Sequence, residues 1–436
     1  GDYTVFYDGD GDLDFDLSSQ VITKDITLKK YVIRVSSPTT GGGLHIVIKR
    51  SNVNDPIRNI RVISPGFENT YQTQTFHPLF LQRLQGVGAI RFMDFQKTNE
   101  NPSTSSRTLK TYFTQSHPNG VALEYQIELA NVLDADPWFN IPHLADDNYI
   151  RQFAITVKQQ LEPDKKVYIE YSNELWNTQF SQTTWIQQQG CNDPITKVTN
   201  AGGSCDNIKS GFKYQAKRSA EIFKIFEEEF GVDANRLVKV AGGRLDAGSV
   251  QTAHSNILMG YFNDTGANPY GDIGKPDALA ITTYFGETIR NQALNQTYSA
   301  LTVSEVLDKA EAHLYNYTKP NIQINKQIAN NYGVKLIAYE GGQHIVAAFE
   351  FTNEANLVNK LLAANRDLRM EDLYNKMYLI WFQEGGNLLA HFNYAFKPDK
   401  FGSWGVLEYQ DQPEADAHKY RATKNAINTY KDGSTI

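Results

Sequence analysis

The chain has 436 residues, of which 41% are hydrophobic and 21% are charged, an ordinary composition for a globular protein. Its net charge of −7 is spread over the whole chain without a basic stripe, so we expect no nucleic-acid partner. No apolar run approaches the length of a membrane-spanning helix, and we expect no membrane span.

Residues 1–58 predict a β-rich N-terminal segment. Short runs rich in aromatic and β-branched residues are separated by Gly, Asp and Pro turns; they are YTVFYD, LDFDL, KKYVIRVSS and GLHIVIKR. Two or three short antiparallel strands are too few to predict an independent domain. We therefore expect this segment to pack on the side or bottom of the domain that follows.

The acidic stretch from Asp8 to Asp16, DGDGDLDFD, has two interpretations. It is reminiscent of a calcium-binding loop, but it lacks the terminal Glu and the full ligand spacing. Alternation with Leu13, Phe15 and Leu17 favours a strand with one wet face.

Residues 59–436 predict an alternation of strands and helices. The strand candidates are 59–65, 88–95, 135–142, 166–173, 237–243, 277–285, 334–341 and 387–394. Segments with helical periodicity lie between them, including a long one at 301–332 and a final one after residue 412. Eight repeats of this kind favour an α/β fold, a closed (β/α)8 TIM barrel, over a doubly wound sheet of five or six strands.

The two cysteines, Cys191 and Cys205, flank one polar, Gly-containing stretch. They predict a disulfide that closes this loop in an oxidising compartment, so we expect a secreted or extracytoplasmic protein; the alternative is two unrelated free thiols. No further Cys or paired His lies nearby, and we expect no zinc site and no cofactor. The chain starts at Gly1 without a basic, apolar leader, which suits a signal peptide that is removed or not included.

Two glutamates stand where apolar strands end. The strand VYIEYSNELWN gives way to Asn173-Glu174, and the strand KLIAYEGGQH ends at Glu340 before two glycines. A carboxylate beside apolar neighbours is costly to bury without a task or a partner. In a barrel, strands four and seven place these two side chains across the mouth from each other. Glycoside hydrolysis needs such a pair, one acid to protonate the leaving oxygen and one carboxylate to attack the anomeric carbon.

On these motifs the chain resembles clan A glycoside hydrolases, over residues 59–432. The resemblance implies that Asn173 holds the sugar 2-hydroxyl, that Glu174 is the acid/base and that Glu340 is the nucleophile. The same dipeptide recurs at Asn99-Glu100 and Asn353-Glu354, where polar surroundings favour a surface position.

Further positions match the resemblance, each with a structural alternative. Arg91 would keep the nucleophile ionised, or is a buried Arg paired with Asp94. Tyr284 would donate a hydrogen bond to the nucleophile, or is a core aromatic. His143 would line the site, or caps a helix or packs in the core.

The aromatic content of 12% suits both a large core and flat platforms for sugar rings. Trp176 and Trp404 are candidates for stacking on a sugar, with core packing as the alternative. The resemblance implies a Trp at the end of strand eight, where this chain has HFNYAF, so Phe392, Tyr394 or Trp404 must take that place. Gln343 and His344 are predicted contacts at the rim.

The sequence therefore predicts a retaining β-glycoside hydrolase that acts on a polysaccharide or oligosaccharide, endo or exo. Glu340 should be ionised, and Glu174 should keep its proton near neutral pH. Long insertions at 178–210 and 342–366 are expected to decide which sugar is cleaved, and the loop between the cysteines to wall one side of the cleft. The main alternative is a carbohydrate-binding or adhesin barrel without turnover. A metal-dependent hydrolase would need an HExxH pattern, which the nine histidines do not form.

Overall fold

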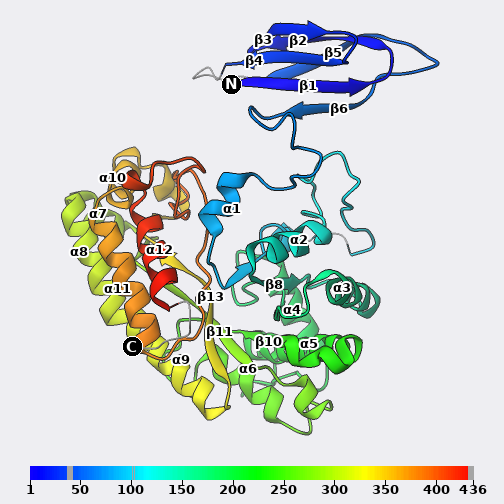
Figure 1. Ribbon diagram of the computed structural model, residues 1–436. Helices are drawn as coiled ribbons and strands as arrows, with labels where there is room; N and C mark the ends of the chain where they lie inside the picture. Colours follow the sequence, from blue (N-terminus) through cyan, green and yellow to red (C-terminus); the bar gives the residue numbers. More distant parts are fainter. Residues whose placement is uncertain (37–42, 101, 103, 431–436) are drawn as a thin grey trace. The chain divides into compact units, whose positions relative to one another are not determined.

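The computed structural model describes residues 1–36, 43–100, 102 and 104–430. By its contacts the chain divides into two compact units, Gly1–Leu81 and Gln82–Ile436 (Figure 1). Among the described residues, no helix has the length and apolar character needed to cross a membrane.

The first unit holds six antiparallel strands in two sheets. One sheet has the order β3-β4-β1-β6, and β2 pairs with β5 in the other. The strands are β1 Asp2–Asp8, β2 Gly11–Leu17, β3 Ser19–Asp25, β4 Lys30–Val35, β5 Leu44–Ser51 and β6 Arg58–Ile63. Side chains of both sheets share one buried core of Val5, Tyr7, Leu13, Phe15, Tyr31 and Ile33. The unit is thus larger than the two or three strands expected from the sequence.

The strand expected to open the barrel, residues 59–65, lies in this first unit. β6 pairs antiparallel with β1, with Val62 opposite Val5, so its assignment to the barrel is wrong. A short run of alternating apolar residues fits an antiparallel edge strand as well as a barrel strand. Its sequence therefore could not decide between the two.

The acidic stretch forms the last residue of β1, the turn after it and most of β2, which confirms the strand interpretation. Leu13 and Phe15 face the core and the aspartates face outward, but Leu17 at the end of β2 is exposed, so the expected alternation does not extend to it. Each aspartate of the stretch has a partner on a neighbouring strand; the pairs are Asp8–Arg61, Asp10–Arg50, Asp12–Lys24, Asp14–Lys49 and Asp16–His45.

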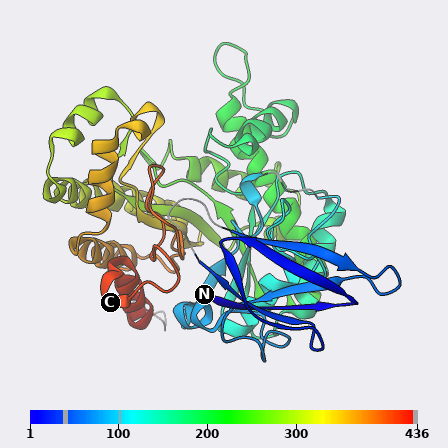
Figure 2. The same ribbon diagram turned by 90° about the horizontal axis from the view of Figure 1, so that it is seen from above.

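The second unit is built on a parallel sheet that curves into a nearly closed barrel, which confirms the predicted fold class (Figures 1 and 2). The sheet order is β13-β11-β10-β9-β8-β7. The strands are β7 Ala89–Arg91, β8 Asp136–Ile141, β9 Val167–Tyr171, β10 Leu237–Gly242, β11 Ala278–Phe285 and β13 Lys335–Gln343. The last predicted strand, 387–394, contributes only a parallel bridge from Leu389 to Ala338. Six of the eight predicted barrel strands therefore form the ladder.

Helices surround this sheet (Figure 2). They are α1 Pro78–Leu84, α2 Leu123–Leu133, α3 Asp147–Gln160, α4 Ser181–Asn192, α5 Asn207–Phe230, α6 His254–Asn263, α7 Gln292–Ala300, α8 Val303–His313, α9 Lys319–Asn331, α10 Ala355–Asn365, α11 Arg369–Gln383 and α12 His418–Tyr430. The predicted segment 301–332 forms α8 and α9, joined by a π-helical turn at Leu314–Thr318. The insertion at 178–210 contributes α4, and that at 342–366 contributes α10.

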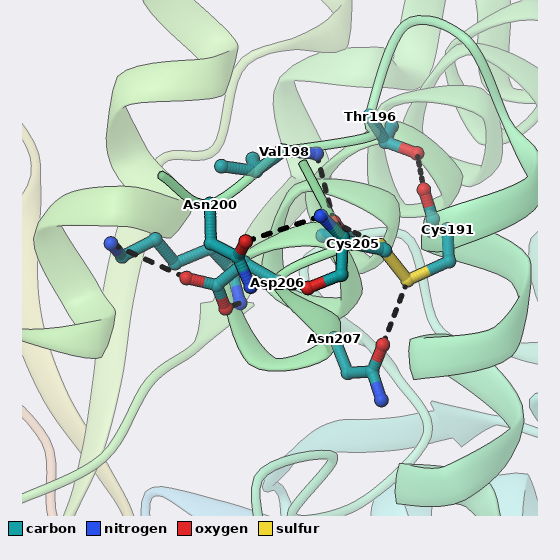
Figure 3. Close-up of a disulfide and its surroundings, with 11 residues drawn as sticks. Cys191, Thr196, Val198, Asn200, Cys205, Asp206 and Asn207 are labelled. Carbon is teal, nitrogen blue, oxygen red and sulfur yellow. Dashed lines mark hydrogen bonds and ion pairs between the residues drawn. A yellow bond between two sulfur atoms is a disulfide. The ribbon is translucent and has the colours of Figure 1, made fainter. Parts of the chain in front are cut away.

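Cys191 and Cys205 form the predicted disulfide. It joins Cys191 in the last turn of α4 to Cys205, which directly precedes the N-cap Asp206 of α5; Figure 3 shows the bond and its surroundings. Two further hydrogen bonds hold the loop between them, from Asp206 N to the Val198 carbonyl at 2.8 Å and from Thr196 Oγ1 to the Gly190 carbonyl at 3.1 Å.

We predict that removing this disulfide destabilises the second unit. The bridge closes a separation of 14 residues, and a loop of that size corresponds to about 3 kcal/mol of unfolded-state entropy. The double variant Cys191→Ser/Cys205→Ser should therefore unfold at lower urea concentration than the oxidised wild type. Reduced wild type is the matched control and should behave like the double variant. Equal midpoints for all three proteins would contradict the prediction.

Candidate active site

The polar side chains predicted for the site come from the ends of the parallel strands. Arg91 is the last residue of β7, and Asn173 and Glu174 follow β9. Tyr284 and Glu340 lie in the last halves of β11 and β13. Because the carboxyl ends of parallel strands meet at one edge of the sheet, these five residues gather there from four strand ends that are far apart in the sequence.

Arg91 is the hub of this cluster. Its guanidinium donates to Glu340 Oε1 at 2.9 Å, to Glu170 Oε2 at 2.8 Å and to Asn173 Oδ1 at 2.8 Å. Arg91 thus pairs with Glu170 and Glu340, and not with Asp94, which is exposed. Burial alone would lower the pKa of the guanidinium, but the charges of Glu170 and Glu340 outweigh burial and raise this pKa. Arg91 is therefore a fixed positive charge.

Glu340 is buried and receives two directed hydrogen bonds. Arg91 donates to Oε1, and the Tyr284 hydroxyl donates to Oε2 at 2.8 Å. Burial raises the pKa of Glu340, while the Arg91 charge and the Tyr284 hydrogen bond act in the opposite direction. Gly341 brings β13 close to β11, because a Cβ at this position would lie 2.0 Å from the Thr283 hydroxyl. Two donors on one carboxylate favour its ionised form.

Glu174 has a different environment. Burial, and next the charge of Glu340, raise the pKa of Glu174 to about 8. A single side-chain donor opposes this rise, Asn177 Nδ2 at 2.9 Å from Oε2. Glu174 therefore holds its proton at neutral pH while Glu340 is the better-stabilised anion. This difference between two neighbouring carboxyl groups is what acid and nucleophile roles require.

The backbone around Asn173 is held in a rarely populated conformation. Ser172 and Glu174 have φ angles of 59° and 41°, in the left-handed region that non-glycine residues seldom adopt. Each such residue costs on the order of 1–3 kcal/mol and persists where the surroundings determine it, frequently at functional sites. Asn173 lies between them with its side chain on Arg91.

Several polar neighbours of the site were not predicted from the sequence. One of them is Glu170, which is 2% exposed and pairs with Arg91. Asn99, expected at the surface, is half-buried and accepts from Asn173 Nδ2 at 3.2 Å and from Gln182 Nε2 at 2.8 Å, so that expectation is wrong for Asn99. Asn99 is far from both partners in the sequence, and no pattern around it indicates that it lies beside the site. Glu100 is exposed, as predicted. Asn353 and Glu354 are exposed, as predicted.

Trp176 is half-buried two residues past Glu174. Its Nε1 donates to the Tyr339 hydroxyl at 3.0 Å, and the Arg244 guanidinium lies 5.0 Å from the ring centroid. Tyr339 directly precedes Glu340, so Trp176 links the segment after β9 to β13. A role in stacking on a sugar remains a prediction.

Trp404 comes back to the site from the long loop after residue 394. Its ring lies against Tyr284 and His344, with centroids 6.0 and 5.0 Å apart. Phe392 lies behind it at 6.1 Å, whereas Tyr394 packs in a separate cluster with Val406 and Leu407. Of the three residues considered for the strand-eight position, Trp404 is therefore the one beside the residue that bonds Glu340.

The remaining predicted contacts lie in packed surroundings. The His143 ring meets Trp185 of α4 edge-on at 5.3 Å, and burial lowers the pKa of His143 to about 4, which favours the packing alternative. His344 bonds Thr288 Oγ1 at 2.9 Å, and burial lowers its pKa to about 4 as well. Gln343 is 3% exposed and its amide bonds the Ser403 carbonyl and Ile345 N, so the prediction of a rim contact is wrong for this residue.

No family model matches the sequence, and no curated protein matches it significantly. The fold is similar to solved glycoside hydrolases. A GH51 arabinofuranosidase from Xanthomonas axonopodis pv. citri is 12% identical with a TM-score of 0.41, over 82% of this chain and 66% of that chain. A double mutant of the beta-glucosidase from Trichoderma harzianum is 11% identical with a TM-score of 0.46, over 80% and 86%. The beta-glucosidase from Thermotoga maritima is 12% identical with a TM-score of 0.39, over 80% and 85%. At such low identities and TM-scores these likenesses assign the chain to no family.

Proposed function

We propose that this protein is a retaining β-glycoside hydrolase acting on a polysaccharide or oligosaccharide. One observation carries the proposal: two neighbouring carboxyl groups have environments that favour opposite protonation states. Buried Glu340 accepts hydrogen bonds from Arg91 and Tyr284, whereas half-buried Glu174 has its pKa raised by desolvation and by the negative charge of Glu340. Binding a sugar would not require this division. A secreted location is part of the proposal and is supported by the disulfide.

In the first half-reaction, Glu340 attacks the anomeric carbon while Glu174 gives its proton to the glycosidic oxygen. The bond from that carbon to the leaving oxygen breaks, and a glycosyl ester on Glu340 forms. Arg91 and Tyr284 hold the attacking carboxylate in place through both of its oxygens. Asn173, fixed by Arg91, is positioned for the sugar 2-hydroxyl.

In the second half-reaction, esterification has removed the negative charge of Glu340. This charge is one of the causes that raise the pKa of Glu174, so Glu174 becomes more acidic and serves as the base. It takes a proton from water, the resulting hydroxide attacks the anomeric carbon, and the ester bond to Glu340 breaks. Both groups return to their starting protonation states.

The stereochemistry of the product tests this proposal. Proton NMR of the anomeric signals during hydrolysis of aryl β-glycosides and a glycan panel should show the β-anomer first. An initial α-anomer would mean inversion and would exclude Glu340 as nucleophile. Binding of glycans without hydrolysis, unchanged in Glu340→Ala, would identify a carbohydrate-binding protein instead.

We predict that activity is lost on the alkaline side at about pH 8. Glu174 must be protonated to act as the acid, and its raised pKa of about 8 keeps it protonated below that pH and deprotonates it above. The measurement is kcat/KM against pH, which reports groups of the free enzyme. The alkaline limb of this profile should be absent in Glu174→Ala, measured with a substrate whose leaving group departs without a proton. A limb near the ordinary pKa of a glutamate would contradict the prediction.

A further inference from the structure

A second buried carboxylate, Glu170, shares Arg91 with Glu340. Its Oε2 accepts from Arg91 Nε at 3.0 Å and Nη2 at 2.8 Å, from Trp138 Nε1 at 2.9 Å and from Asn140 Nδ2 at 2.9 Å. All of these donors converge on one oxygen. The other oxygen faces Gly242, where an added Cβ would lie 3.1 Å away.

Glu170 is enclosed by three neighbouring strands of the barrel and by the residues of the proposed site. The charged or titratable groups that act on it or respond to it are Arg91 from β7, Glu174 after β9, and Tyr339 and Glu340 from β13. From β8 only the neutral Trp138 and Asn140 bond it. With 2% of its surface exposed, Glu170 cannot touch a substrate. Any role in the reaction must act through Arg91.

The contacts give Arg91 a fixed orientation. Two guanidinium nitrogens are tied to Glu170, which leaves Nη1 directed at Glu340. The same contacts divide one positive charge between two carboxylates, so Glu340 feels Arg91 less strongly than it would alone. We propose that Glu170 is a positioning residue of the active site, one that aims Arg91 at Glu340 and limits how strongly Arg91 stabilises the charge of Glu340.

The direction of its electrostatic effect is the same on both partners. The Glu170 charge raises the pKa of Glu340 and the pKa of Glu174. Removing that charge should therefore lower both pKa values together. Under the proposed function, on which this part of the inference rests, the acidic and alkaline limbs of kcat/KM should both move to lower pH.

Two substitutions separate charge from position. Glu170→Gln removes the charge but can keep the four hydrogen bonds, because they all end on one oxygen, which the amide carbonyl replaces. We expect both limbs to shift to lower pH. Glu170→Asp keeps the charge but withdraws the carboxylate from Arg91. We expect Glu170→Asp to leave both limbs of the kcat/KM profile at their wild-type pH. Its kcat should fall by about 10²-fold, since a shift of about 1 Å in a positioned group has that effect.

Glu371→Gln is the matched control, because Glu371 also pairs with an arginine, Arg421, but on α11 and α12. This change should leave both limbs in place even if it lowers stability. Unshifted limbs in Glu170→Gln, or wild-type kcat in Glu170→Asp, would overturn the inference.

A second readout does not need turnover. Carboxyl signals of ¹³C-labelled glutamate can be titrated by NMR, with Glu174 and Glu340 assigned by their glutamine variants. Both should titrate at lower pH in Glu170→Gln than in wild type. If the protein hydrolyses no glycoside but these titrations shift, the proposed function fails and the inference about Glu170 stands. Unshifted titrations in an active enzyme would overturn the inference about Glu170 and leave the proposed function in place.

Discussion

Glu340→Gln is expected to lower kcat on the order of 10⁵-fold, equivalent to about 7 kcal/mol in activation free energy. The amide has no charge with which to attack the anomeric carbon, so no glycosyl ester forms. The substitution should fold normally, because the amide oxygen can still accept from Arg91 and the amide nitrogen can donate to the oxygen of Tyr284. These two contacts are made by different oxygens of Glu340 in the wild type.

Initial rates on an aryl β-glycoside and circular dichroism check this prediction. Glu354→Gln is the matched control: Glu354 follows an asparagine as Glu174 does, but it is exposed, so its loss should leave kcat unchanged. Azide added to Glu340→Ala should restore turnover and yield the α-glycosyl azide, since the anion attacks from the vacated side. If the kcat of Glu340→Gln is within tenfold of the wild-type value, Glu340 is not the nucleophile.

Glu174→Ala is expected to slow turnover according to the leaving group. A poor leaving group needs the proton of Glu174, and its loss should cost about 10²–10⁴-fold. A dinitrophenyl leaving group departs without a proton, so the first step should be nearly unaffected. The second step then limits turnover, because no base activates water, and a burst of dinitrophenolate should appear before the steady state.

Stopped-flow measurements on both substrates test this pattern. Azide should accelerate the second step and give the β-glycosyl azide, the anomer opposite to that from Glu340→Ala. Asn177→Ala is a useful comparison, because it removes the side-chain hydrogen bond to Glu174 and keeps the acid. The rates of Asn177→Ala should vary with the leaving group as those of the wild type do. Equal losses on both substrates in Glu174→Ala would assign Glu174 a structural role.

Much of the site could be predicted because its residues interrupt apolar strands at their ends. Glu174, Tyr284 and Glu340 each follow a buried run, and Arg91 ends the short apolar strand β7; the fold brings such strand ends together. The structure places all four in one connected cluster, with Tyr284 and Arg91 bonded to Glu340.

Other features had no readable local signal. Glu170 sits inside the strand VYIEY, where one polar residue resembles the wet face of a half-buried strand, although all of β9 is buried apart from Tyr168. Asn99 approaches Asn173 only through tertiary contacts across 74 residues. Residues 59–65 have the alternation of a strand, but alternation does not say which sheet the strand joins. Such pairings depend on contacts that no short window of sequence contains.

The self-contained core of the six N-terminal strands bears on how this protein can evolve. All residues proposed for catalysis lie in Gln82–Ile436, and none contributes to the cluster built on Val5, Tyr7 and Tyr31. A module that buries its own apolar surface can be exchanged, duplicated or lost between genes while the chemistry elsewhere is inherited unchanged. Loss or exchange of the N-terminal strands would therefore remove none of the residues proposed for catalysis.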